Sequence, residues 1–258
     1  MDIAVLISGV ADPKWPLPKD LSVASLQAHA TQYAALSPFD EAALEIALAL
    51  RDADPTVRIT ALVAAEEGLT RRVAGWRPDA IHRVDLDAVP RYDTGAVARA
   101  LAQALHELAP TATMVLIGRE FGDLDDGTAP AALSLAHDAP FIPLVLGVKL
   151  VQEKLIALRQ AANGLERLQL PSRAVLSASN DPGNRLRHPL MKNVMMAKKA
   201  VLPVWRAPQS HAFASAQLQL QSVNAAETPV RSSACEWLEG SAQQKADALA
   251  RVLMEAGA

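Results

Sequence analysis

The sequence predicts an α/β protein in which a mainly parallel twisted sheet is flanked by helices. Short apolar runs alternate with helical patterns through the first 140 residues, which is typical of parallel strands joined by crossover helices. The chain has 258 residues, of which 50% are hydrophobic and 21% charged, so it can bury a substantial core. An Asn163-Gly164 pair between two β-like runs predicts an antiparallel hairpin section.

The strands are expected in short apolar runs. The four runs in the first half of the chain are mostly unbroken, as in strands that are buried on both faces. Beyond residue 140 the β-like runs lie around the hairpin turn, so this section is expected to be antiparallel. The predicted strands are residues 3–7, 57–63, 81–84, 114–117, 144–151, 155–160, 165–170 and 174–177.

The clearest predicted helix covers residues 38–52. Ser37 can cap it, Pro38 suits its first position, and Asp40 and Glu41 complement the helix dipole at its start. Residues 94–108 and 128–137 repeat the helical apolar spacing and are expected to flank the sheet, and residues 242–254 form another amphipathic pattern.

Two regions are expected along the chain. Residues 1–202 are expected to form the α/β domain. Residues 203–239 are rich in Ala, Gln, Ser and Pro and show little periodicity, so they cannot readily bury a core of their own. We therefore expect residues 203–258 to form an extended C-terminal arm that ends in a helix and packs on a partner subunit.

Composition excludes several classes of protein. A net charge of −3 and a pI near 6.1 provide no broad attraction for nucleic acid or an anionic membrane. Cys235 is the only cysteine, which excludes an internal disulfide and a paired-cysteine redox motif. No apolar stretch approaches the roughly 20 residues of a membrane span, and no signal or transit peptide pattern follows Met1, so a cytoplasmic protein is expected.

Three separated segments are candidates for function. The first, residues 37–41, opens a helix, where N–H groups and the helix dipole favour an anion, although simple helix capping also explains it. The second, residues 118–127, follows a predicted parallel strand, where open α/β sheets bind ligands. Its carboxylates could instead hold a divalent metal or form a solvated acidic loop.

The third segment covers residues 184–199 and follows a polar stretch that reads as an exposed loop. Met191 lies near its middle, and a flexible unbranched side chain suits a docking surface. From the residues alone, Met191 could equally be a buried loop residue, and Lys198-Lys199 a solvated charge run.

The three segments together resemble, in order, the beta subunit of electron-transfer flavoproteins, whose patterns are N-P-F-x-E, G-[KR]-Q-x-x-D-x-D and N-E-P-R-Y-P-x-L-x-x-I-M-K-A-K-K. The resemblance covers most of residues 1–205. It implies a nucleotide-binding domain of the adenine nucleotide alpha hydrolase type and a heterodimer with an alpha subunit that holds most of the FAD. It also implies a structural AMP, electron transfer from a flavin-dependent dehydrogenase to an acceptor such as a quinone oxidoreductase, and no self-sufficient catalysis.

The resemblance also implies the site residues. In the family the first two segments surround the nucleotide and the third docks the dehydrogenase through one exposed aliphatic anchor, here Met191. No catalytic or metal-binding residue is expected. The expected cofactor-binding residues are Leu6, Ser8, Ser37, Pro38, Phe39, Asp40, Ala64, Gly118, Arg119, Glu120, Asp123, Asp125, Gly127 and Thr128, and the expected docking residues are Asn184, Arg187, Pro189, Leu190, Met191 and Lys192.

The chain departs from the family pattern around the nucleotide. Ser8-Gly9 replace a Lys-Arg pair, Ser37 replaces Asn, and Thr128 and Pro130 replace Gln and Gly. These departures leave open a nucleotide-free scaffold paralogue and a flavin-bifurcating relative with a second FAD. A self-sufficient adenine-nucleotide enzyme is a third alternative, but it needs a nucleophile, base or metal near the loop. The candidate histidines His82, His106 and His137 are more simply interpreted as structural.

Overall fold

The computed structural model describes residues 1–122, 127–208 and 237–256, except for the side chains of residues 23, 27, 31 and 256. The chain divides into two compact units, Met1–Val223 and Asn224–Ala258. Each unit is described separately below.

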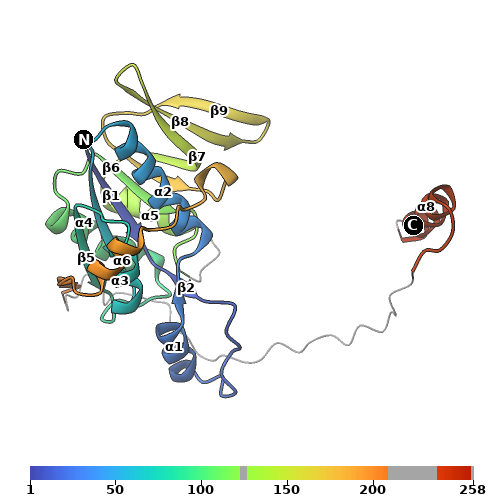
Figure 1. Ribbon diagram of the computed structural model, residues 1–258, viewed down its shortest axis with the longest axis horizontal. Coiled ribbons are helices and arrows are strands. Elements are labelled where there is room, and N and C mark those ends of the chain that lie inside the picture. Colours follow the sequence, from blue (N-terminus) through green and yellow to red (C-terminus); the bar gives the residue numbers. More distant parts are fainter. Residues whose placement is uncertain (123–126, 209–236, 257–258) are drawn as a thin grey trace. The chain divides into compact units, whose positions relative to one another are not determined.

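The described part of the first unit contains a nine-stranded sheet in the order β11-β5-β4-β1-β6-β10-β7-β8-β9 (Figure 1). All pairs from β11 to β7 are parallel, and β7, β8 and β9 are antiparallel. The predicted α/β fold with an antiparallel section is confirmed. The strands are β1 Asp2–Ile7, β4 Arg58–Val63, β5 Ala80–Asp85, β6 Met114–Gly118, β7 Phe141–Val151, β8 Lys154–Ala161, β9 Gly164–Gln169, β10 Ala174–Ala178 and β11 Val204–Arg206, with β2 Val10–Ala11 and β3 Ala34–Ala35 forming a separate antiparallel pair.

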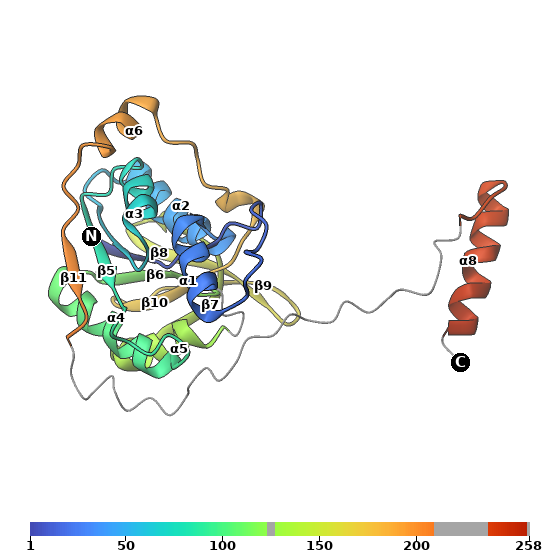
Figure 2. The same ribbon diagram turned by 90° about the horizontal axis from the view of Figure 1, so that it is seen from below.

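The two faces of the sheet carry separate apolar cores because successive strand residues point to opposite sides. Ile3, Val5 and Ile7 of β1 pack into the core that contains helix α2 (Pro38–Ala53). Ala4 and Leu6 face the core that contains α4 (Thr94–Leu108) and α5 (Thr128–Ala136). Figures 1 and 2 show this layered arrangement. With both faces covered, the central strands are continuous apolar runs.

Helix α2 begins as the sequence predicts. The Ser37 hydroxyl accepts a hydrogen bond from Asp40 N (3.0 Å), and the Asp40 carboxylate accepts one from Ser37 N (3.1 Å). This reciprocal capping satisfies two N–H groups of the first turn, and Pro38 occupies the position that lacks an N–H to satisfy.

Several short elements differ from the sequence prediction. Helices α1 (Val23–Gln32), α3 (Glu67–Ala74) and α6 (Met191–Ala197) were not predicted, and a 3-10 turn covers Pro182–Asn184. Residues 204–206, which we expected in the C-terminal arm, instead form edge strand β11, with Trp205 paired to Val84 of β5. Trp205 is buried, and its indole N–H donates to Glu107 (2.6 Å).

The described part of the second unit contains helix α8 (Ala242–Ala256), which covers the predicted helix. Leu249, Val252 and Leu253 recur at helical spacing and are exposed. Much of the expected arm, including Cys235, lies outside the described residues, and the packing of α8 on a partner stays a prediction. No helix among the described residues is long and apolar enough to cross a membrane.

Candidate ligand cavity and docking segment

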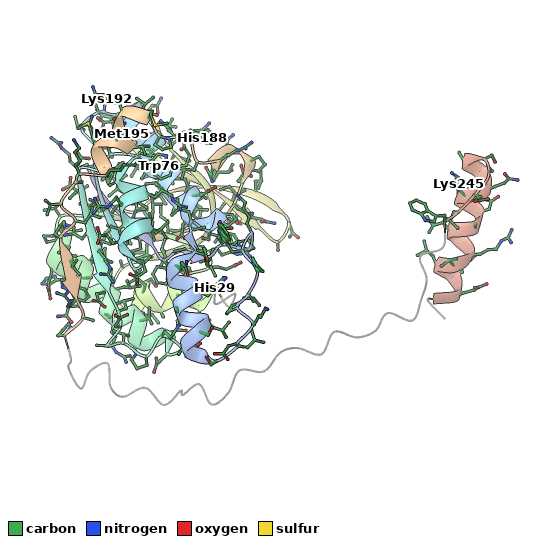
Figure 3. All side chains as sticks on the ribbon, turned by 60° about the horizontal axis from the view of Figure 1, so that its bottom comes forward. His29, Trp76, His188, Lys192, Met195 and Lys245 are labelled. Atoms are coloured by element: carbon green, nitrogen blue, oxygen red, sulfur yellow. The ribbon has the colours of Figure 1, made fainter. Side chains whose placement is uncertain are left out.

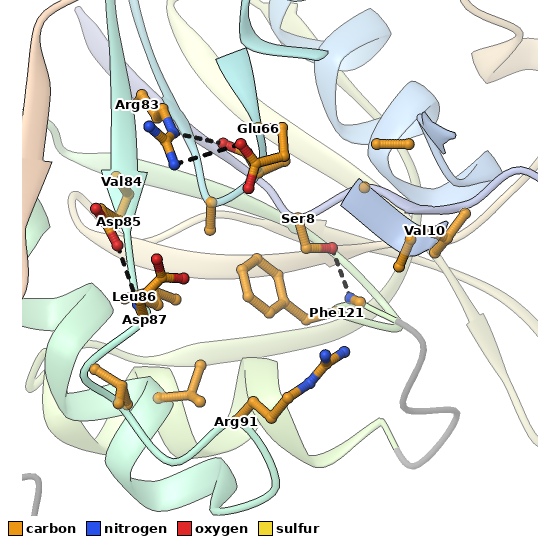
Figure 4. Close-up of a pocket in the computed structure, with 18 of the residues that line it drawn as sticks. Ser8, Val10, Glu66, Arg83, Val84, Asp85, Leu86, Asp87, Arg91 and Phe121 are labelled. Carbon is orange, nitrogen blue, oxygen red and sulfur yellow. Dashed lines mark hydrogen bonds and ion pairs between the residues drawn. The ribbon is translucent and has the colours of Figure 1, made fainter. Parts of the chain in front are cut away.

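A cavity of about 660 Å³ opens at the carboxyl ends of the parallel strands (Figure 4). Its walls come from the segments that follow β1, β4, β5 and β6. The sheet order places β4 and β5 on one side of β1 and β6 on the other, so the cavity lies at the point where the strand order reverses. Open α/β sheets bind ligands at this position. The lining includes Ser8, Gly9, Ala64, Ala65, Leu86, Phe121 and Gly122.

The cavity walls carry both signs of charge. Arg83 lies 3.5 Å from the Glu66 carboxylate and donates to the Ala65 carbonyl (3.2 Å). Figure 4 shows Arg91 directed toward the cavity from the loop after β5, and its guanidinium carbon lies 5.4 Å from the centre of the Tyr92 ring. Sequence reasoning missed Glu66, Arg83 and Arg91. The sequence signal that could have identified them is their position at, or just after, predicted strands whose carboxyl ends lie at this edge of the sheet.

A buried carboxylate lies beside the cavity. Asp40 is 0% exposed, and it accepts hydrogen bonds from Ser8 N (3.2 Å) and Gly9 N (3.0 Å) as well as from Ser37 N. Burial raises the pKa of Asp40 to about 6, against the opposing effect of these hydrogen bonds. Ser8 and Gly9 line the cavity, so this carboxylate adjoins one of its walls.

The loop after β6 packs over the start of α2. The guanidinium carbon of Arg119 lies 4.8 Å from the centre of the Phe39 ring, and Arg119 also pairs with Glu120. At Gly118, a side-chain Cβ would lie only 2.9 Å from Phe39 Cβ, so the close approach of the two segments requires glycine. The first two predicted segments therefore meet, and their contact with a nucleotide stays a prediction.

Of the remaining predicted cofactor residues, some line the cavity and others lie elsewhere in the fold. Ala64 and Ser8 line the cavity, and the Ser8 hydroxyl accepts from Gly122 N (2.6 Å). Leu6 is fully buried in the core beneath α4 and α5, and Pro38 is exposed. Gly127 caps α5 in a left-handed conformation, and the Thr128 hydroxyl lies 3.5 Å from that of Thr94. Asp123 and Asp125 lie outside the described residues.

The cavity has the size of a small-molecule site. Its volume lies within the range of about 300–1,000 Å³ typical of small-molecule sites, which is large enough for a nucleoside. At the start of α2, where the resemblance implies the phosphate, the N–H groups of Ser8, Gly9 and Ser37 donate to the Asp40 carboxylate. The described residues contain no group of three or more His, Cys, Asp or Glu that could hold a metal ion.

The first residues of the third predicted segment are held in place by contacts with other parts of the same chain. Asn184 is buried and donates to the Leu146 carbonyl (2.6 Å). The Arg187 guanidinium pairs with Glu45 (2.6 Å) and with Asp52, and these carboxylates raise the pKa of Arg187 above its ordinary value. Asn184 and Arg187 were expected to contact a partner, but their side chains bind groups of their own chain.

Two further side chains bind the segment, Arg71 of α3 and Trp76 of the turn that follows it. The Trp76 indole N–H donates to the Arg187 carbonyl (2.7 Å). Arg71 donates to three carbonyls at the end of α6, those of Ala197, Lys198 and Ala200 (3.1, 2.8 and 3.1 Å). Such donors satisfy the carbonyls that a helix leaves without partners at its C-terminus.

The outer face of the segment is apolar and exposed. Leu190 and Met191 are 70% and 74% exposed, and Met195 and Met196 are each more than half exposed. Figure 3 shows Lys192 and Met195 on α6, with Trp76 and His188 nearby. Pro189 is half-buried and Lys192 is exposed. Clustered exposed apolar side chains, unlike scattered ones, are typical of an interaction surface.

The fold and these two regions define an α/β protein with a ligand-sized cavity at the carboxyl edge of its sheet and a separate segment, residues 184–199, with an exposed apolar face. Residues 26–210, more than half of the chain, match the model of the electron transfer flavoprotein domain, and the chain belongs to this family. It is 29% identical over 176 residues to the electron transfer flavoprotein subunit beta of Megasphaera elsdenii. This match spans 65% of the chain and 64% of the relative, less than two thirds of its length. The predicted resemblance to a beta-type subunit is confirmed.

Proposed function

We propose that this chain is the beta-type subunit of a heterodimeric electron-transfer flavoprotein. Membership of the family and similarity to a beta subunit support this proposal. The single cysteine excludes an internal disulfide couple, so electrons must reside on a cofactor. The flavin supplies the one- and two-electron chemistry, and this chain contributes binding, orientation and docking without catalysis of its own. The FAD is held mainly by an alpha subunit.

The observation that carries the proposal is the combination of an exposed apolar surface and a rigid base in the segment of residues 184–199. Arg187, Trp76 and Arg71 fix the backbone at both ends, whereas Leu190 and Met191 remain largely exposed. A pre-organised anchor loses little conformational entropy on binding. We assign the docking of a flavin-dependent dehydrogenase to this surface. A flavin held in the heterodimer would let electrons from this dehydrogenase reach a downstream acceptor such as a quinone oxidoreductase, in the cytoplasm.

Co-expression with the alpha-type subunit of the same genome tests the proposal. We expect a stable one-to-one complex that carries FAD, is yellow, and is reduced by its cognate dehydrogenase. Full-length beta-type chain purified alone is expected to be colourless. Release of two FAD per complex identifies the flavin-bifurcating alternative, and ATP turnover by the chain alone identifies the adenine-nucleotide enzyme. A stable solitary chain that never binds a flavin-carrying partner contradicts the proposal.

A further inference from the structure

The two cations that line the cavity differ in their partners. Among the described lining residues, Arg83 and Arg91 carry a positive charge. Arg83 lies 3.5 Å from the Glu66 carboxylate and donates to the Ala65 carbonyl (3.2 Å), so its charge is already balanced within the chain. Arg91 pairs with no carboxylate among the described residues. Its contact with the Tyr92 ring, at 5.4 Å, restrains the guanidinium without supplying a hydrogen-bond acceptor.

Arg91 lies apart from the acidic part of the cavity. Asp85 and Asp87 line the cavity at the end of β5, and in Figure 4 the Arg91 side chain points away from them. In this view it is directed toward the side where Ser8 and Phe121 lie, and the lining residues described there are uncharged. The charge of the cavity is therefore divided, with carboxylates at the ends of β4 and β5 and one cation without a partner among the described residues elsewhere.

This division of charge favours a ligand that carries both hydrogen-bond donors and an anion. Hydroxyl and amino groups can donate to the carboxylates, as a ribose does at the strand ends of other doubly wound sheets. A phosphate can accept two hydrogen bonds from the planar guanidinium of Arg91, which suits that geometry better than an ammonium group does. A nucleotide combines these groups in one molecule, and a volume of about 660 Å³ is typical of a small-molecule site.

We propose that Arg91 is a further ligand-binding residue, whose guanidinium binds the phosphate of an adenine nucleotide in the cavity. The inference rests on the proposed function, because the nucleotide concerned is the AMP that a beta-type subunit is expected to hold. Sequence reasoning assigned no role to Arg91. Because the contact is made to phosphate, it strengthens the binding of AMP and contributes nothing to the binding of adenosine.

The first experiment compares AMP and adenosine as probes. Their dissociation constants are measured by calorimetry on the alpha–beta complex after bound nucleotide has been removed. The wild type should bind AMP more tightly than adenosine. Arg91→Ala should weaken AMP binding by roughly tenfold to a hundredfold, the range for a hydrogen bond between charged groups, and leave adenosine binding unchanged. No AMP binding by the wild type, an unchanged AMP affinity, or equal losses for both probes overturns the inference.

Two matched variants test whether the charge and shape of Arg91 matter. Arg91→Lys keeps the charge without the planar fork and should give a loss of AMP affinity between those of wild type and Arg91→Ala. Arg99→Ala removes an exposed cation of α4 that does not line the cavity and should change neither affinity. If Arg91→Ala does not fold, Arg91→Gln replaces it. A loss of AMP affinity in Arg99→Ala equal to that in Arg91→Ala overturns the inference.

The thermal midpoint distinguishes binding from a structural role. Arg91 is exposed, so Arg91→Ala without nucleotide should melt at the wild-type temperature, whereas the stabilisation by added AMP should be smaller than in the wild type. A lower midpoint without nucleotide, together with an unchanged ratio of AMP to adenosine affinity, identifies a structural arginine and overturns the inference.

A competition experiment identifies the source of the phosphate. Inorganic phosphate at the concentration of AMP should not displace it, because it lacks the nucleoside contacts. Complete displacement assigns the site to free phosphate and overturns the inference. An FAD-containing complex whose AMP affinity does not depend on Arg91 leaves the proposed function intact. Failure to form any complex contradicts the proposed function instead, and the same binding comparison is then made on the full-length chain alone.

Discussion

Arg187 and Glu45, 142 residues apart in the chain, form the ion pair that joins the segment of residues 184–199 to helix α2. Three hydrogen bonds connect the Arg187 guanidinium to the two Glu45 oxygens, and Arg187 N adds a fourth. The Glu45 side chain is only 11% exposed, whereas that of Arg187 is 41% exposed. The pair therefore fixes the segment from a mostly buried position beneath it.

Replacing Arg187 by alanine should lower the free energy of unfolding by about 1–2 kcal/mol, because it leaves the mostly buried Glu45 carboxylate without its cation. Denaturant unfolding measures this change. In a double-mutant cycle, the loss of stability in the Arg187→Ala/Glu45→Ala double variant should be smaller than the sum of the losses in the two single variants. The control is Arg185→Ala, two residues away and exposed, which should change stability by less than about 0.5 kcal/mol. Equal effects of the two substitutions contradict the assignment.

Met191→Ala should weaken docking without affecting folding. Met191 is 74% exposed, so truncation leaves no cavity in the core, but it removes apolar area from the proposed anchor. We expect the apparent KM of the cognate dehydrogenase for the complex to rise about tenfold, which corresponds to 1.4 kcal/mol, with an unchanged thermal midpoint. Leu135→Ala on α5, where Leu135 is 84% exposed, is the matched control and should leave KM unchanged. An unaltered KM for Met191→Ala removes Met191 as the anchor.

The buried Asp40 should make stability depend on pH. Its pKa of about 6 in the folded chain exceeds the ordinary 3.8, so the folded state binds this proton more tightly than the unfolded state. The free energy of unfolding should therefore fall as pH rises from about 4 to about 6, by on the order of 3 kcal/mol. The difference between wild type and Asp40→Asn isolates this effect from other groups. A difference that is flat, or that rises with pH, refutes the prediction.

Gly118→Ala should destabilise the contact between the loop after β6 and α2. The new Cβ would lie 2.9 Å from Phe39 Cβ and 3.1 Å from the Glu120 carbonyl oxygen, atoms that cannot move independently of the backbone. Such overpacking costs about 1–3 kcal/mol. Gly68→Ala in α3 is the control. A Cβ at this position meets no atom within 4 Å, and the substitution removes a glycine from a helix. The control should leave stability unchanged or raise it by up to about 1 kcal/mol.

The sequence predicted the elements whose signals are local. Helix α2 carries its capping residues Ser37 and Pro38 in the sequence itself, and the central strands are apolar runs because both of their faces are covered. Helix α3 was missed because it has only eight residues and two arginines in its last turn. Strand β11 was missed because its partner β5 lies about 120 residues earlier, and no local pattern specifies that pairing.

Whether the start of α2 and the loop after β6 hold a nucleotide stays a prediction. The family resemblance assigns both segments to one nucleotide, and in the structure the two segments meet, with Arg119 over Phe39. It did not predict that the Asp40 carboxylate turns toward Ser8 and Gly9, more than 30 residues away. Hydrogen bonds of that range depend on tertiary packing rather than on neighbouring residues.

An acceptor that belongs to the polypeptide is present at every stage of the protein's life, whereas a metabolite must be captured from the cell. A fold completed by a small molecule gains stability only in proportion to the logarithm of that molecule's concentration. Since Asp40 supplies its own oxygens to the N–H groups of Ser8, Gly9 and Ser37, these three groups keep an acceptor in the folded chain whatever the concentration of any small anion.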